Sequence, residues 1–187
     1  GQQGSSLQCC CLAEEPSMQQ IVQISSLIDS EVVKPSDATN STTTAVEDPG
    51  KTSSYFDSEL KELREMKDRN AQSVDMKHTF QSGATYSGQW KKGARHGFGR
   101  QRWPDGAVYE GQWEDNCAVG KGRFAHNDGD VFIGQWKGNM ASGLGIYYHK
   151  GCTTYRGEWN NDLQDGHGVE MWVEGARYEG RFTDGQK

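Results

Sequence analysis

The stretch Tyr86-Ser87-Gly88-Gln89-Trp90 decides the fold, because its pattern returns at a constant interval through the second half of the chain. Each copy holds an aromatic residue, a glycine two residues later and a second aromatic residue after two more. The copies start 23 residues apart, at Tyr86, Tyr109, Phe132, Tyr155 and Tyr178. A Gly-x-Gly pair follows four of them, at Gly97, Gly120, Gly143 and Gly166. A fixed period of this length is the mark of a repeat architecture.

The spacing inside one copy predicts a β-strand, since residues two apart share one face of a strand. The aromatic residues should then form the core of the array: Tyr86, Trp90, Tyr109, Trp113, Phe132, Trp136, Tyr155, Trp159, Tyr178 and Phe182. Three residues after the second aromatic comes a residue type that tolerates positive φ, namely Gly93, Asn116, Asn139, Asp162 or Gly185. A tight turn at that place makes each repeat a β-hairpin.

Stacked hairpins share an apolar layer that one hairpin lacks. The sequence therefore predicts an all-β array over residues 79–187, an elongated, twisted sheet of antiparallel hairpins. Its start near residue 79 rests on Phe80, which lies 23 residues before Trp103. The fifth copy stops at Lys187, just after its turn. An open edge is a pairing hazard, so a homodimer through this C-terminal edge is one expectation.

These motifs resemble those of the MORN (membrane occupation and recognition nexus) family, whose repeat begins Tyr-Glu-Gly-x-Trp and continues through Gly-x-Gly. The resemblance covers about 108 residues, and two copies depart from it, with Phe132 for the first tyrosine and Phe182 for the tryptophan. Both substitutes are aromatic, so the packing pattern survives. The resemblance implies a scaffolding or targeting module with protein-binding grooves and, in some members, phospholipid contact.

The residues before the array have a different composition. Residues 1–54 are rich in Ser, Thr, Asp and Glu and poor in aromatic residues, which is typical of a largely disordered tether. Within it, residues 18–33 place apolar side chains at helical spacing between two prolines, as in a short docking helix or a transient one. Residues 55–78 are predicted to contain a helix that caps the first repeat or else binds a partner, with Phe56, Leu60 and Leu63 on its apolar stripe.

The first eleven residues predict lipid attachment. Gly1 followed by Ser5 fits N-myristoylation once an initiator methionine is removed, and Cys9, Cys10 and Cys11 fit palmitoylation. One acyl chain gives marginal membrane binding, and a second signal is needed. The first basic residue is Lys34, so a polybasic patch cannot be that signal. The alternative is that Gly1 is a cloning remnant and the cysteines are incidental.

Composition excludes several classes of function. The formal charge of −6 arises in the first 80 residues, with 13 acidic and 7 basic residues, whereas the remainder carries 13 of each. No basic cluster favours nucleic acid. His126 and His149 share a slot that Trp103 and Trp172 fill in other repeats, so they are interpreted as aromatic substitutes rather than metal ligands. With no catalytic constellation and no nucleotide motif, the sequence predicts a protein that is not an enzyme and needs no cofactor.

The first functional hypothesis is a scaffold on the cytoplasmic face of a plasma membrane or a cortical (pellicle) membrane. It would bind a helix or extended peptide of a protein partner in a groove lined by Trp103, His126, Tyr147 and Trp172. A second hypothesis is binding of acidic phospholipid by the early repeats, through Lys91, Lys92, Arg95, Arg100, Arg102, Lys121 and Arg123. A third is a self-assembling structural protein of the cell cortex.

Overall fold

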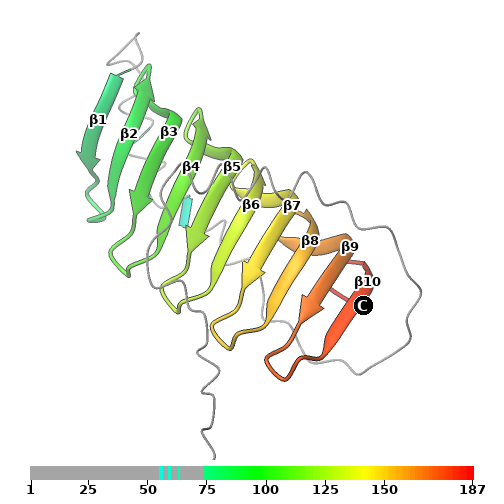
Figure 1. Cartoon of the computed structure of the whole chain (residues 1–187). Helices are drawn as coiled ribbons and strands as arrows, with labels where there is room; N and C mark the ends of the chain where they lie inside the picture. Colours follow the sequence, from blue (N-terminus) through cyan, green and yellow to red (C-terminus); the bar gives the residue numbers. More distant parts are fainter. Residues whose placement is uncertain (1–54, 57–58, 60–62, 64–73) are drawn as a thin grey trace, which may run out of the picture.

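The computed structural model describes residues 55–56, 59, 63 and 74–187. In this part of the chain, ten antiparallel strands form one open sheet, and each strand pairs with the next along the chain. The strands are β1 Val74–Thr79, β2 Thr85–Lys91, β3 Ala94–Arg102, β4 Val108–Glu114, β5 Cys117–Ala125, β6 Val131–Lys137, β7 Met140–Tyr148, β8 Thr154–Asn160, β9 Leu163–Met171 and β10 Arg177–Phe182. Figure 1 shows an elongated, twisted succession of hairpins. The predicted all-β array of stacked hairpins is confirmed.

The start of the array differs from the prediction. Residues 74–78, counted with the capping helix, belong to strand β1, which pairs with β2 from Val74↔Trp90 to Thr79↔Thr85. These residues form a strand and not part of a helix because β1 is the second strand of an incomplete first repeat. The Trp90 indole donates to the Met76 carbonyl at 3.1 Å, as Trp113, Trp136 and Trp159 do to the strand directly before their own.

A helix capping the end of the array is not seen among the described residues. Of the segment before β1, the structure describes Tyr55, Phe56, Glu59 and Leu63, which lie against the face of the sheet. The predicted tether (1–54), its helix at 18–33 and the acylation sites Gly1 and Cys9–Cys11 lie outside the described residues.

The tight turns fall where the sequence places them. At each one, two consecutive residues have positive φ, as a two-residue turn of the mirror-image type requires. Asp115 and Asn116 have φ of 46° and 72° between β4 and β5. The corresponding pairs are Lys92–Gly93, Gly138–Asn139, Asn161–Asp162 and Asp184–Gly185.

The turn residues also tie one repeat to the one before it. The Ala118 amide donates to Asn139 Oδ1 at 2.7 Å, and the Asn139 amide returns a bond to the Ala118 carbonyl at 3.1 Å. The same two-way bond joins Asn116 to Arg95 and Asp162 to Ala141. We call these contacts the turn staples. Only three of the five turns can form the bond to the turn residue's side chain, because the first and last turns have glycine at this position.

The recurring glycines leave space for aromatic rings. Gly111 and Gly122 face each other across β4 and β5. A Cβ on Gly122 would lie 2.5 Å from the Tyr109 hydroxyl and 2.7 Å from its ring. The ring therefore lies over bare backbone, and its hydroxyl donates to the Gln112 carbonyl at 3.0 Å. The close approach explains why each repeat keeps a glycine at this place despite its cost in a strand.

The glutamine after the strand glycine supports a bulge. Its side chain accepts a hydrogen bond from the middle residue of the facing Gly-x-Gly, as when the Lys121 amide donates to Gln112 Oε1 at 2.7 Å. Gln89 and Gln135 act likewise, and Glu158 replaces them in the fourth repeat. This role of the glutamine was not predicted from the sequence.

Candidate functional site

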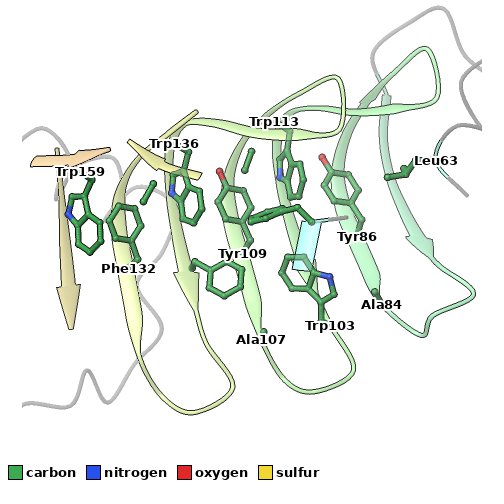
Figure 2. Packing of buried hydrophobic residues seen from close by; sticks show 14 of the residues in the cluster. Leu63, Ala84, Tyr86, Trp103, Ala107, Tyr109, Trp113, Phe132, Trp136 and Trp159 are labelled. Carbon is green, nitrogen blue, oxygen red and sulfur yellow. The ribbon is translucent and has the colours of Figure 1, made fainter. Parts of the chain in front are cut away.

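One face of the sheet carries a continuous row of aromatic rings, and we call it the aromatic face. Each ring of one repeat meets the tryptophan or phenylalanine of the next, so that Trp113 contacts both Tyr86 and Tyr109. Centroid distances along the row lie between 4.9 and 5.5 Å and interplanar angles between 79° and 90°. Edge-to-face geometry of this kind is favourable for aromatic pairs. Figure 2 shows the rings alternating across the strands.

Hydrogen bonds fix the tryptophans of this row. The Trp113 indole donates to the Gly99 carbonyl at 3.1 Å, and Trp136 and Trp159 donate to the equivalent carbonyls of Gly122 and Gly145. Burial raises the pKa of the Tyr109 hydroxyl well above its ordinary value, so it remains a donor and not a base at neutral pH. The indole hydrogen bonds fix the orientation of the indole rings in the row.

The aromatic face holds a side chain from the segment before β1. Phe56 is fully buried and contacts five rings at centroid distances of 5.3 to 5.8 Å. We call these rings the Phe56 cage: Trp103, Tyr109, Trp113, Phe124 and Trp136. Next to it, Tyr55 packs against Trp103 and Phe124, and its hydroxyl donates to Asp105 at 2.6 Å. Burial and the Asp105 carboxylate raise the pKa of Tyr55 to about 12.

A buried polar cluster lies beside the cage. The Glu59 carboxylate accepts from Gln101 Nε2 at 3.2 Å and from the Ser82 hydroxyl at 3.1 Å. Gln101 Oε1 in turn accepts from Arg95 Nη1 at 2.9 Å. Glu59, Gln101 and Arg95 are each at most 2% exposed. A buried carboxylate is tolerated only with such partners.

Arg95 is held from several sides. Its guanidinium lies 4.3 Å from the Trp113 ring centroid, and Nη2 donates to the Asn116 carbonyl at 3.1 Å. Burial lowers the pKa of Arg95 to about 10, while the charge of Glu59 opposes this shift, so the side chain stays protonated at neutral pH. Its Nε atom is buried without a hydrogen-bond partner. The cation therefore depends on Glu59 and the ring for compensation.

Three of the four predicted groove residues lie near one another, because Trp103 and His126 both contact Phe124 and His126 contacts Tyr147. Trp103 is 4% exposed beneath Tyr55 and Phe56. His126 and Tyr147 are half-buried neighbours, with ring centroids 6.5 Å apart. The Tyr147 hydroxyl donates to Asp130. Trp172 lies at the far end, under the Lys187 ammonium at 4.2 Å.

The predicted lipid-contact residues do not form one surface. Arg95 is fully buried on the aromatic face, and Arg123 is 7% exposed. Arg100 lies 3.7 Å from the Glu110 carboxylate. Arg95 cannot reach a lipid headgroup from the interior, because its side chain is held between the Trp113 ring and Gln101. Fewer than the seven proposed basic residues are therefore available to bind phospholipid.

The polar cluster of Glu59, Gln101 and Arg95 was not predicted from the sequence, which assigned Arg95 to lipid contact, although a signal existed. Arg95 stands where the other repeats have Ala118, Ala141 and Gln164. Gln101 stands where the next two have Phe124 and Tyr147. Departures from the repeat consensus thus mark the polar cluster.

Other kinds of site find no support in the described residues. No group of three or more His, Cys, Asp and Glu side chains among them could hold a metal ion. In the same part of the chain, no helix combines the length and apolar character needed to cross a membrane.

The fold and the site define a class: an open-sheet repeat protein whose buried aromatic row forms a surface for other side chains. The model of the MORN repeat matches residues 86–108, 109–131, 132–153 and 155–177, so the chain is a MORN repeat protein. No enzyme family is among the matches, and no curated protein matches the sequence.

Among solved structures, the chain is similar to the SAS-4 (dCPAP) TCP domain from Drosophila melanogaster, in complex with a proline-rich motif of Ana2 (dSTIL). The identity is 6% and the TM-score 0.32, over 58% of this chain and 72% of the other.

Proposed function

We propose that this chain is a non-enzymatic scaffold, tethered to the cytoplasmic face of a membrane, that binds a protein partner on its aromatic face. The observation that supports binding is the burial of Phe56 in a cage of five rings. A face that accepts an aromatic side chain of its own chain has the shape and chemistry to accept one from a partner.

The cage recurs along the array. Each of its five slots is filled one repeat later, 23 residues on, by another ring: His126, Phe132, Trp136, Tyr147 and Trp159. Two contacts within this second set repeat the geometry of the first, with the Phe132 and Tyr147 ring centroids 5.1 and 6.0 Å from that of Trp159. A partner that carries aromatic or aliphatic side chains at a matching interval would engage more than one repeat.

Partner capture tests the binding part of the proposal. The tagged full chain would be expressed in a eukaryotic cell, and co-purified proteins would be quantified for the native sequence, Trp172→Ala and Met171→Ala. Trp172 is a predicted groove residue, whereas Met171 is its neighbour on strand β9 and is 45% exposed. We expect a stoichiometric partner that is lost with Trp172→Ala and kept with Met171→Ala. Identical recovery in both variants would count against the aromatic face.

Membrane attachment is proposed from Gly1 and Cys9–Cys11. Two acyl chains would hold the chain stably, whereas one would not. The test is membrane fractionation of the full chain with Gly1→Ala, or with all three cysteines changed to serine, together with intact-mass measurement. Each variant should move to the soluble fraction. A native chain that carries no acyl mass would overturn this part and leave partner binding untouched.

A further inference from the structure

The segment before β1 contributes three buried side chains at intervals of three and four residues. They are Phe56, Glu59 and Leu63, and none is more than 2% exposed. The Leu63 amide donates to the Glu59 carbonyl at 3.0 Å, the bond of one α-helical turn. Residues at these intervals lie on one face of a helix. The aromatic face is therefore covered, in part, by an aromatic–acidic–aliphatic stripe of the same chain.

The segment contacts two features of the array: the aromatic cage around Phe56 and the polar groups around Glu59. The first recurs along the array and the second does not. The aromatic cage recurs in the next repeat, as described above. The carboxylate receptor does not recur, because Ala118 and Ala141 replace Arg95 in the two following repeats. An acidic residue three positions after an aromatic one can thus be neutralised at one register only. Arg95 and Gln101 would set where along the array such a ligand binds.

The charge of Arg95 restricts what could replace the segment on the aromatic face. Arg95 would keep its cation–π contact with Trp113 but lose the nearby carboxylate of Glu59. Without the segment, water can solvate the guanidinium, but a ligand that buried it again without a counter-charge would be strongly unfavourable. Any replacement for the segment must therefore bring its own carboxylate as well as its own ring.

We propose that Arg95, Gln101 and the Phe56 cage form a receptor for a helical peptide with an aromatic residue, a glutamate three positions later and a leucine after four more. The chain's own Phe56, Glu59 and Leu63 occupy this receptor as an intramolecular competitor. A partner with the same stripe binds there once the segment leaves. This inference rests on the proposed peptide-binding function and names the partner's chemistry.

The experiment uses a fluorescent peptide with the sequence of residues 53–66 and measures its binding to the full chain by anisotropy. The native chain should bind it weakly, because the receptor is occupied. The double variant Phe56→Ala, Glu59→Gln should bind it at least tenfold more tightly. A peptide with lysine in place of the glutamate should lose that gain. Adding Arg95→Gln to the double variant should also abolish it.

Two controls keep the outcome interpretable. Circular dichroism and thermal unfolding must show that each variant keeps its sheet, and Arg100→Gln on the double variant should bind the peptide unchanged, since Arg100 lies on the other face. Equal affinity of the native chain and the folded double variant would overturn the inference, as would equal binding of the lysine peptide. Partner capture that still depends on Trp172 would then leave the proposed function intact.

Discussion

At the residue scale, Phe132 is the one residue at the first aromatic position of the five repeats that lacks a hydroxyl. The tyrosines at the same slot donate to the backbone carbonyl three residues on, as Tyr109 does to Gln112 at 3.0 Å and Tyr155 to Glu158 at 2.9 Å. Phe132→Tyr should add this bond to the Gln135 carbonyl and raise the free energy of unfolding by about 1 kcal/mol. Chemical denaturation measures the change, and Tyr109→Phe should lose a similar amount. A destabilised Phe132→Tyr would mean that the slot is too short for a hydroxyl.

Gly122 tests the close approach of ring and backbone. Gly122→Ala would place its Cβ 2.5 Å from the Tyr109 hydroxyl, and Tyr109 is fully buried and cannot move aside. We expect a loss of about 2–3 kcal/mol, in the range of overpacked cores. The exposed Gly151→Ala serves as the control and should change stability by less than about 0.5 kcal/mol. A loss of stability as small as that of the control would show that the Tyr109 ring can shift to make room for the added methyl group.

At the scale of the hairpin, the turn staples link one element to the next, and Asp162 makes one of them with a carboxylate. Its Oδ1 accepts from the Ala141 amide at 2.6 Å, and the residue is 4% exposed. Burial raises the pKa of Asp162 to about 6 from 3.8, an effect that the Ala141 bond partly offsets. The folded state therefore holds this proton more tightly than the unfolded state does.

The sign of the pH effect follows from linkage. The protonated carboxyl contributes stability that is fully present below about pH 4 and is lost as pH rises through about 6. Asp162→Asn keeps the acceptor without the charge and should be more stable than the native chain by about 1–2 kcal/mol at pH 7. The difference should shrink toward pH 4. Thermal unfolding from pH 4 to 8 measures it.

Asn139→Asp is the matched reverse change, because Asn139 makes the same staple one repeat earlier. Asn139→Asp should lower the stability of the protein at pH 7, and this loss should disappear at acid pH. A difference between Asp162→Asn and the native chain that does not vary with pH would contradict the assignment.

At the scale of the whole molecule, each strand pairs only with its neighbours in sequence, and the ring contacts join adjacent repeats, so stability should vary along the array. Such one-dimensional arrays gain interface energy on both sides of an inner repeat and on one side of a terminal one. The described part of the segment before β1 also adds buried contacts with β4–β6 and with Trp103 through Phe56. Amide hydrogen exchange should therefore be slowest in β4–β6 and fastest in β10. Equal protection from β1 to β10 would contradict this prediction.

The repeats were predictable because their evidence is local and periodic. A two-residue turn at Asn116 and the shared face of Tyr109 and Trp113 follow from spacing and residue type alone. Strand β1 escaped prediction, since Val74–Thr79 lacks both the strand glycine and the Gly-x-Gly pair. The polar cluster escaped it too, because Glu59 and Gln101 are 42 residues apart and no period relates them.

The sequence by itself determined the period, the hairpin, the turn positions and the identity of the ring row, because each of these depends on interactions within one 23-residue unit or between identical units. Only the tertiary structure decided what covers the aromatic face and which cation the cover needs. Those contacts join a non-repeating segment to the places where Arg95 and Gln101 break the pattern. The free energy of such a contact depends on burial, which exists only after the hairpins have stacked.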